Sequence, residues 1–459
     1  MRVGYAVRDI TPTPGLTLSG FASRCEQPSR GVDDPIVVHA LAIESGRELL
    51  LLLVYDLLAL GPEITAEIDA AIRTQAGAPG LRMNLTLCCT HTHSAPATIK
   101  LIGCGTPDRS YWNLLVNVSV GVTREALAGL RRATLRYVTL PVRNVSFNRR
   151  SVLADGRVVM TRNPAVPVVK TGPTWNRFLL VRLDDENGKG IVGVANWAAH
   201  PCVVCTQDVS ADYPGELRSR LSGSLDIPFL YLQGACGNVN LPFQKMVRAE
   251  MLEDVDALLH SLPEIAWPSA RTASASELAC NLRLPYAPVP PRQELETFRR
   301  GMDLIAGTGS GPHSVTSVLA NILNVELGQS AAPAMMRYVA AALSRWAGEL
   351  LDRYDDLPQS CDLGLKVWRL GPLIFCFIAA EVFAETAIRL QEAFPDLVVS
   401  TVGYASPLVG YLPTDDALAE GGYEVEYAYR FYGHPAPFAA GTEPAVVRAL
   451  SSAIACAVG

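Results

Sequence analysis

Two apolar segments near the start of the chain most restrict its possible folds. Residues 36–44 and 49–58 are almost continuously apolar, and only a short polar segment separates them. Such segments are typical of β-strands that are covered on both faces. Residues 62–74 follow with isoleucines at helical spacing, and another apolar, β-prone segment ends at Cys89. Strand, helix and strand in this order predict an α/β fold with a mixed central β-sheet flanked by helices.

The later chain continues this alternation, with one interruption. Residues 178–183 and 191–197 predict a β-hairpin around a Glu-Asn-Gly turn. Residues 280–355 are mainly helical in spacing, so we expect one domain over residues 1–459 with a helical insertion or lid at 280–355. Other helices are expected at 111–131, 214–221, 246–262, 381–394 and 443–458, and other strands at 135–146, 228–233, 363–367, 373–378 and 397–403.

Composition excludes several classes of function. The 459 residues are 49% hydrophobic and 18% charged, which indicates a folded globular protein. A net charge of -6 without a Lys/Arg cluster argues against a nucleic-acid partner. The longest apolar stretch, 49–60, is interrupted by Asp56 and is too short to cross a bilayer. No apolar signal core opens the sequence, and the eleven cysteines have no regular spacing. We therefore expect a cytoplasmic protein that acts on a small molecule; its oligomeric state is left open.

A histidine pair, His91 and His93, directly follows the strand that ends at Cys89. On an extended strand, side chains two residues apart project to the same side of the sheet. Two imidazoles at a strand end suit a metal ligand and a neighbouring acid/base group. The plainer alternative is two polar residues at the start of a loop. Because the chain has only seven histidines, we favour the functional interpretation.

Three other polar groups also follow predicted strands: His200, the segment 234–240 and Glu381. In α/β sheets, ligand sites form outside the carboxyl ends of strands, so we expect these groups to converge. His91, His200 and Glu381 would suit a catalytic zinc ion, which takes about three protein ligands and keeps one open position. Each also has a plainer explanation. His200 would be a turn histidine before Pro201, and Glu381 a carboxylate that begins the helix 381–394.

Cys202 and Cys205 form a C-x-x-C pair directly after His200. A thiolate zinc site or a redox pair is therefore an alternative. The sequence has no second C-x-x-C, which a four-cysteine structural zinc site usually needs, so we favour cysteines that only pack.

Taken in chain order, these motifs resemble the catalytic domain of the neutral/alkaline (non-lysosomal) ceramidases and their bacterial relatives. The likeness covers most of the chain and rests on short motifs in the right order. They are Val3-Gly4 with Asp9-Ile10-Thr11-Pro12, Gly31-Val32-Asp33-Asp34-Pro35, Thr90-His91-Thr92-His93-Ser94, Asn148-Arg149-Arg150, Asn196-Trp197-Ala198-Ala199-His200, Ser210-Ala211-Asp212-Tyr213-Pro214-Gly215, Gln233-Gly234-Ala235-Cys236-Gly237-Asn238-Val239-Asn240, Ala380-Glu381-Val382-Phe383 and Gly422-Tyr423-Glu424.

The resemblance implies a zinc-dependent enzyme that cleaves amide bonds. His93 would be the acid/base group beside the metal, and Arg149 would hold the substrate carbonyl or its oxyanion. This agrees with general chemistry, because a metal ion and a cationic donor stabilise an oxyanion and a histidine can protonate a leaving nitrogen. The zinc ligands that the resemblance implies are His91, His200, Glu381 and Tyr423.

Further residues are expected to bind substrate or to support the ligands: Asp212, Asn238, Asn240 and Tyr432. Asp212 would either orient a metal-bound imidazole or be an ordinary helix N-cap. Tyr423 and Tyr432 share a tyrosine-rich loop, so which of its tyrosines meets the metal stays open.

The chain also departs from the family. Gly237-Asn238-Val239-Asn240-Leu241 stands where ceramidases have G-D-V-S-P, which excludes a serine nucleophile there. The immunoglobulin-like C-terminal domain and a secretion signal have no counterpart in the sequence. We therefore expect a small or differently acylated substrate instead of ceramide, in a biosynthetic pathway. Alternatives are an ester or lactone hydrolase, an acyl-transfer or ring-forming catalyst with the same zinc site, or a binding protein without catalysis.

Overall fold

The two apolar segments become neighbouring strands of a large mixed sheet, β3 (Val37–Ser45) and β4 (Glu48–Tyr55). Their side chains alternate between two hydrophobic cores. Leu52 faces a second sheet on one side, whereas Leu51 and Leu53 face helices on the other. Because both faces are covered, polar positions are absent from the middle of these strands, as the sequence predicted.

The structure is a computed structural model that describes residues 1–142, 145–160, 166–241, 267, 269–270, 275–311, 316, 318–319 and 332–459. Within these residues the large sheet has the order β14-β12-β11-β6-β1-β3-β4-β5, and β16 pairs with β6. Neighbouring strands are antiparallel except β4–β5 and β12–β14, which are parallel. Its other strands are β1 (Arg2–Asp9), β5 (Arg82–Cys89), β6 (Arg131–Pro141), β11 (Arg177–Asp185), β12 (Gly190–Trp197), β14 (Phe229–Gln233) and β16 (Ser269–Ala270).

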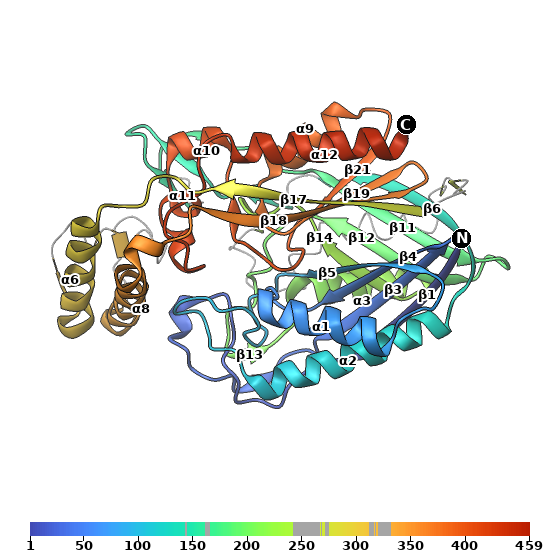
Figure 1. The fold of residues 1–459 in the computed structure, drawn as a ribbon, viewed down its shortest axis with the longest axis horizontal. Helices are drawn as coiled ribbons and strands as arrows, with labels where there is room; N and C mark the ends of the chain where they lie inside the picture. Colours follow the sequence, from blue (N-terminus) through green and yellow to red (C-terminus); the bar gives the residue numbers. More distant parts are fainter. Residues whose placement is uncertain are drawn as a thin grey trace.

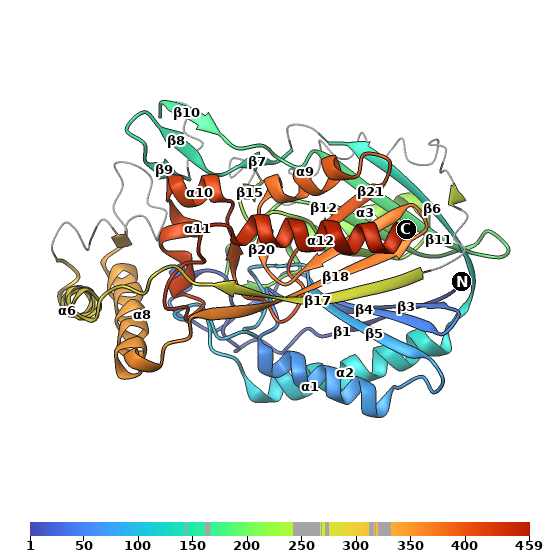
Figure 2. The same cartoon turned by 45° about the horizontal axis from the view of Figure 1, so that its top comes forward.

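A smaller sheet of order β17-β18-β19-β21 stacks on the large one (Figures 1 and 2). The predicted mixed α/β class is confirmed, but the sequence did not predict this second sheet. Leu41 and Leu52 of the large sheet share one core with Trp368 and Phe375 of the small sheet. The strands of the small sheet are β17 (Ala275–Pro285), β18 (Ser360–Leu370), β19 (Leu373–Ile378) and β21 (Val398–Val402).

Helices cover the two outer faces, which gives four layers (Figure 1). α1 and α2 pack on the large sheet with a second core that includes Ile64 and Leu115. α3 packs beside β14 with a third core that includes Leu217. α9 and α12 cover the small sheet. These helices are α1 (Pro62–Gln75), α2 (Arg109–Ala128), α3 (Asp212–Leu225), α9 (Ala384–Ala393) and α12 (Thr442–Val458).

Short strand pairs and turns join the edges of the two sheets. β20 (Glu381–Val382) runs parallel to β22 (Tyr411–Leu412), and β15 (Val239–Asn240) pairs with β7 (Phe147–Asn148). Tyr404 accepts a hydrogen bond from the amide of Cys89 and donates one to the carbonyl of Ala380. The backbone of Tyr404 therefore links β5 of the large sheet to the segment that follows β19 of the small sheet. The remaining short elements are β2 (Gly31–Val32), β8 (Ser151–Leu153), β9 (Val158–Val159), β10 (Val168–Thr171), β13 (Asp208–Val209), η1 (Ala22–Arg24), η3 (Tyr354–Asp356), η4 (Ala428–Arg430), α10 (Asp415–Glu420) and α11 (Tyr423–Glu426).

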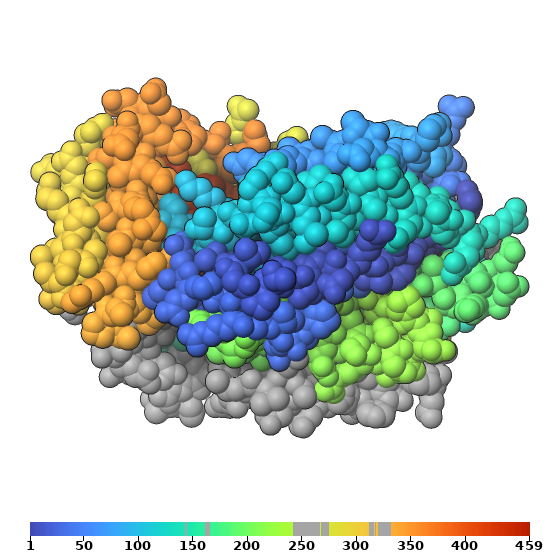
Figure 3. All heavy atoms as spheres, turned by 90° about the horizontal axis from the view of Figure 1, so that it is seen from below, coloured from blue at the N-terminus to red at the C-terminus, as the bar shows by residue number. Residues whose placement is uncertain are grey.

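Two helices, α6 (Arg292–Thr308) and α8 (Pro333–Asp352), lie beside each other at one end of the layers. The space-filling view shows α8 next to the N-terminal part of the chain (Figure 3), and α8 contacts η1. The predicted insertion 280–355 thus begins inside β17 and contains both helices. That this insertion acts as a lid remains a prediction. The single domain over residues 1–459 also remains a prediction.

The predicted hairpin 178–197 is confirmed as β11 and β12. The prediction that Glu381 begins a helix is wrong, because Glu381 lies in β20 and α9 begins three residues later at Ala384. The helix expected at 246–262 lies outside the described residues. Over the part of the chain that the structure describes, no helix is both long enough and apolar enough to cross a bilayer.

Candidate metal centre

His91 lies in the tight turn that follows β5. The strand ends at Cys89, and His91 has a left-handed backbone conformation with φ of 68°. Strand alternation therefore does not explain how the two histidines are placed, contrary to the sequence argument. Instead, the amide of His91 donates to the carbonyl of Leu57 at 2.9 Å, and its Nδ1 lies 2.9 Å from the carbonyl of Leu58. A non-glycine residue with positive φ is uncommon and often marks a functional site.

His200 follows β12 and is fixed in the same way. Its amide donates to the carbonyl of Val239 at 2.9 Å, and its Nδ1 lies 3.1 Å from the carbonyl of Cys236. A carbonyl oxygen can only accept, so Nδ1 of each imidazole carries the proton. In a neutral ring, Nε2 of His91 and of His200 then keeps its lone pair. This is the arrangement of metal-binding histidines, whose other nitrogen is held by a hydrogen bond.

The three histidine side chains converge through their Nε2 atoms. Nε2 of His91 lies 3.1 Å from Nε2 of His200 and 3.3 Å from Nε2 of His93. Since the Nε2 atoms of His91 and His200 are both acceptors, they cannot bond to each other. Two nitrogen ligands of a tetrahedral zinc ion lie roughly 3.3 Å apart, which agrees with the observed separation. His91, His93 and His200 form a group that could hold a metal ion.

Glu381 approaches these histidines from the small sheet. Its Oε2 lies 3.3 Å from Nε2 of His91 and 3.8 Å from Nε2 of His200. Oε1 accepts a hydrogen bond from the hydroxyl of Tyr432. Oε2 is buried and has no hydrogen-bond partner among the described residues. A buried carboxylate oxygen without a donor is costly, so this donor set fits a cation.

The electrostatic surroundings keep His93 and His200 neutral. Burial lowers the pKa of His200 well below its ordinary value, and the positive charge of Arg149 lowers it further. Burial also lowers the pKa of His93, and His91, Arg24 and Arg149 add to this effect. Neutral imidazoles can bind a metal ion or accept a proton, whereas imidazolium ions cannot.

Arg149 is buried beside the histidines and is held by three side chains. Its Nε donates to Oε1 of Glu424 at 2.8 Å, Nη2 to the hydroxyl of Tyr411 at 3.0 Å and Nη1 to Oδ1 of Asn240 at 3.3 Å. Arg150 donates to the other oxygen of Glu424 at 2.8 Å. Burial lowers the pKa of Arg149, but Tyr411 and Glu424 outweigh burial and raise it well above its ordinary value. Arg149 therefore stays charged.

The two asparagines of the segment 234–240 have different contacts. Asn240 bonds to Arg149, and its backbone forms an isolated bridge with His200. Asn238 accepts from the amide of Ala384, at the start of α9, and donates to Oε2 of Glu385 at 2.7 Å. The structure therefore places Asn240 beside the metal centre, and both groups of the Asn238 side chain bond within the scaffold.

Asp212 is the first residue of α3, and the N-cap is Ala211, so the N-cap alternative for Asp212 is wrong. Its Oδ2 accepts from the amides of Val203 and Val204 at 3.0 and 2.8 Å. Asp212 thus holds the loop that follows His200.

Cys202 and Cys205 lie in this loop, partly buried and exposed respectively. The only group with metal-binding geometry among the described residues contains no cysteine.

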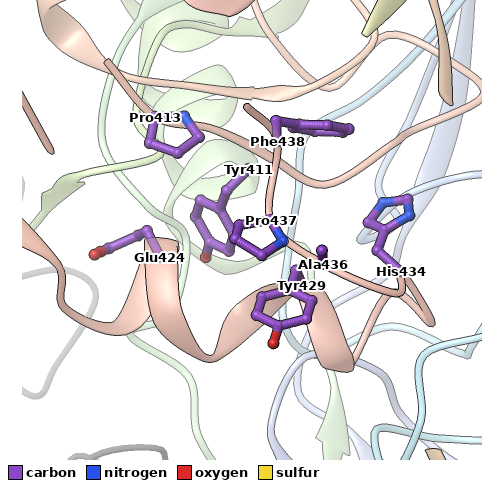
Figure 4. A pocket seen from close by; sticks show the side chains of 8 residues that line it. All are labelled: Tyr411, Pro413, Glu424, Tyr429, His434, Ala436, Pro437 and Phe438. Atoms are coloured by element: carbon purple, nitrogen blue, oxygen red, sulfur yellow. The ribbon is translucent and has the colours of Figure 1, made fainter. Parts of the chain in front are cut away.

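The tyrosine-rich loop brings several rings to the site. Tyr432 bonds to Glu381, whereas Tyr423 packs its ring against Tyr411 at 6.1 Å between centroids. Tyr411 and Glu424, which both hold Arg149, also line a small and largely aromatic pocket (Figure 4). The residues that line it are Tyr411, Pro413, Glu424, Tyr429, His434, Ala436, Pro437 and Phe438.

Sequence reasoning missed three residues of the site: Tyr404, Tyr411 and Glu424. The ring of Tyr404 lies 4.1 Å from the ring of His91, and its hydroxyl contacts Sγ of Cys236 at 2.9 Å. Glu424 had a signal, because a buried Arg-Arg pair needs a carboxylate and Glu424 adjoins Tyr423. Tyr404 and Tyr411 reach the site only through backbone hydrogen bonds between segments far apart in the chain, which no local pattern reveals.

The fold of the chain is similar to that of two solved ceramidase structures. The neutral ceramidase from Pseudomonas aeruginosa superposes with a TM-score of 0.65 and 18% identity, covering 98% of this chain and 73% of that chain. A ceramidase complexed with C2 superposes with a TM-score of 0.67 and 17% identity, covering 98% and 74%. No protein-family model and no curated protein matches the sequence.

Proposed function

We propose that the protein is a metal-dependent hydrolase that cleaves an amide (C–N) bond of a small or acylated substrate. The observation that carries the proposal is the buried Oε2 of Glu381, which faces two histidine nitrogens with no proton to donate. Such a group of acceptors is stable around a cation. The shared fold with neutral ceramidases supports an amide as the bond that is cleaved.

We assign His91, His200 and Glu381 as metal ligands, with Tyr423 as the fourth ligand. Tyr432 then acts on the metal through Glu381, because its hydroxyl holds Oε1 and leaves Oε2 for the ion. Nitrogen and oxygen ligands of this kind favour zinc. When bound, a zinc ion supplies a Lewis acid and lowers the pKa of a water molecule to about 7.

The other side chains have separate roles in the proposed reaction. His93 is neutral and half-buried, so it can accept a proton from water and pass it to the leaving nitrogen. Arg149 uses three of its donors on Glu424, Tyr411 and Asn240, and a guanidinium has five N–H groups. The remaining donors of Arg149 would hold the carbonyl oxygen as negative charge develops on it.

The test combines metal content with a substrate screen. We expect about one zinc ion per chain in the wild type by elemental mass spectrometry, little in His200→Ala, and wild-type content in His39→Gln, a buried histidine outside the site. Matched short-chain amides and esters are then compared, and amides are expected to be hydrolysed by wild type and His39→Gln but not by His200→Ala. Wild type that binds no zinc even after zinc is added would overturn the proposal. If the wild type hydrolyses esters but not amides, the protein is an esterase.

A further inference from the structure

The loop that carries η1 lies directly against His93. The imidazole of His93 contacts the ring of Phe21, with 4.8 Å between centroids and an interplanar angle of 60°. Gly20 has φ of 103°, and a Cβ atom there would lie 2.6 Å from Cγ of His93. The backbone therefore approaches the imidazole more closely than any side chain would allow.

Arg24 ties the same loop to the turn that holds His93. It is buried, and its guanidinium donates to the carbonyl of His93 and, at 2.9 Å, to Oγ of Ser94. Its Nε donates to the carbonyl of Thr206 at 2.9 Å. The guanidinium also lies over the ring of Phe21, 4.8 Å from its centroid. Arg24 thus fixes both Phe21 and the backbone of His93.

His93 needs this support more than the two proposed ligands do. A backbone carbonyl holds Nδ1 of His91 and another holds Nδ1 of His200. For Nδ1 of His93 the neighbouring backbone group is Gly20 of this same loop, and the contact is too weak to fix the ring. The orientation of His93 is therefore set mainly by packing, and the groups that pack on it from outside the histidine cluster are Phe21 and Gly20.

We infer that Phe21 and Arg24 are positioning residues for His93, which orient its imidazole for proton transfer without touching the substrate themselves. The inference rests on the proposed function in assigning proton transfer to His93. The support continues outward, because α8 contacts η1 (Figure 3). A displaced acid/base group lowers the rate of the chemical step, whereas metal binding depends on His91, His200 and Glu381.

The first test measures the orientation of His93 without any substrate. Diethyl pyrocarbonate modifies accessible histidines, and mass spectrometry resolves the rate at each site. In zinc-loaded Arg24→Lys and Phe21→Leu we expect His93 to react about tenfold faster than in wild type, since loosened packing exposes the ring. Zinc content is expected to be unchanged. Arg73→Lys, at an exposed pair with Asp69, is the matched control and should behave as wild type.

The second test is a double-mutant cycle on kcat with the best amide substrate. Arg24→Lys and Phe21→Leu are each expected to lower kcat about 10- to 100-fold, and Phe21→Tyr, which keeps the ring, should restore most of it. Neither change should lower kcat further in a His93→Ala background. Wild-type modification rates at His93, or effects that multiply with His93→Ala, would overturn the inference. An enzyme with no hydrolase activity would refute the proposed function instead, and the modification rates would still decide whether Phe21 and Arg24 orient His93.

Discussion

The hydroxyl of Tyr432 donates a hydrogen bond to Oε1 of Glu381, and the other carboxylate oxygen therefore faces the histidines. The two residues are 51 positions apart in the chain. The bond fixes the rotation of a carboxylate whose other oxygen has no hydrogen-bond partner among the described residues. Tyr432 therefore determines which oxygen of Glu381 is offered to a metal ion.

The two tyrosines of this loop should differ in their effect on zinc affinity. Tyr432→Phe removes the group that orients Glu381, and we expect zinc to bind about 10- to 100-fold more weakly. Tyr423→Phe removes a proposed ligand and should weaken binding more. A competition titration with a chromogenic chelator measures both. If Tyr432→Phe is the more damaging change, the fourth ligand is Tyr432.

Glu424 should be essential for folding stability. It neutralises two buried arginines, Arg149 and Arg150, at 2.8 Å each. Glu424→Gln removes the carboxylate that pairs with buried Arg149 and leaves Arg150 only its longer contact with Glu420, so we expect a loss of about 3–5 kcal/mol in the free energy of unfolding. Glu420→Gln, at a partly exposed partner of Arg150, should cost less than about 1 kcal/mol. Urea denaturation compares the two variants, and equal losses would contradict this account of Glu424.

Acid should destabilise the protein partly through His39. Burial lowers the pKa of His39 well below its ordinary value, and Arg218 lowers it further. The unfolded chain therefore takes up a proton near pH 6.5 that the folded chain does not. Stability from this group is present above that pH and is lost as the pH falls below it, by up to about 1.4 kcal/mol per pH unit. Urea denaturation between pH 5 and pH 8 should show a shallower loss in His39→Gln; an identical slope would exclude His39 as a source.

Metal removal should lower thermal stability as well as activity. A ligand that binds only the folded state adds about 4 kcal/mol when its free concentration is a thousand times Kd. We therefore expect a chelator to lower the Tm of the wild type measurably. His200→Ala, which should not retain zinc, is the control and should show no shift. A chelator effect of the same size in both proteins would locate the stabilising metal elsewhere.

Local patterns predicted the strands around the site well. The apolar character of β3, β4 and β12 comes from burial on both faces, which any window of sequence shows. The stacking of the second sheet could not be predicted, because a period-two pattern does not identify the partner of a strand. The same limit explains Glu381. Its neighbours are compatible with a helix start. Glu381 becomes part of a strand only because its amide donates to the carbonyl of Gly410 and because it pairs with Tyr411.

For the site itself, sequence spacing identified polar groups at strand ends, and the structure brings His91, His200 and Glu381 together. The geometry that relates them comes from features without a sequence signal. His91 is turned inward by its left-handed backbone, and the carbonyl of Leu58 selects its tautomer. Backbone carbonyls are present at every residue, so their part in a site becomes visible only when the chain is folded.

The two histidines and the glutamate belong to opposite halves of the sandwich, since His91 and His200 follow strands of the large sheet and Glu381 follows a strand of the small one. In the proposed ligand set, His91 and His200 come from the large-sheet half, and Glu381 and Tyr423 from the other half. This set is complete only after the halves have docked, and an ion bound by all four residues would then resist their separation. The moment at which the refolding chain binds zinc would therefore report when the two sheets dock, and the bound ion would hold them together.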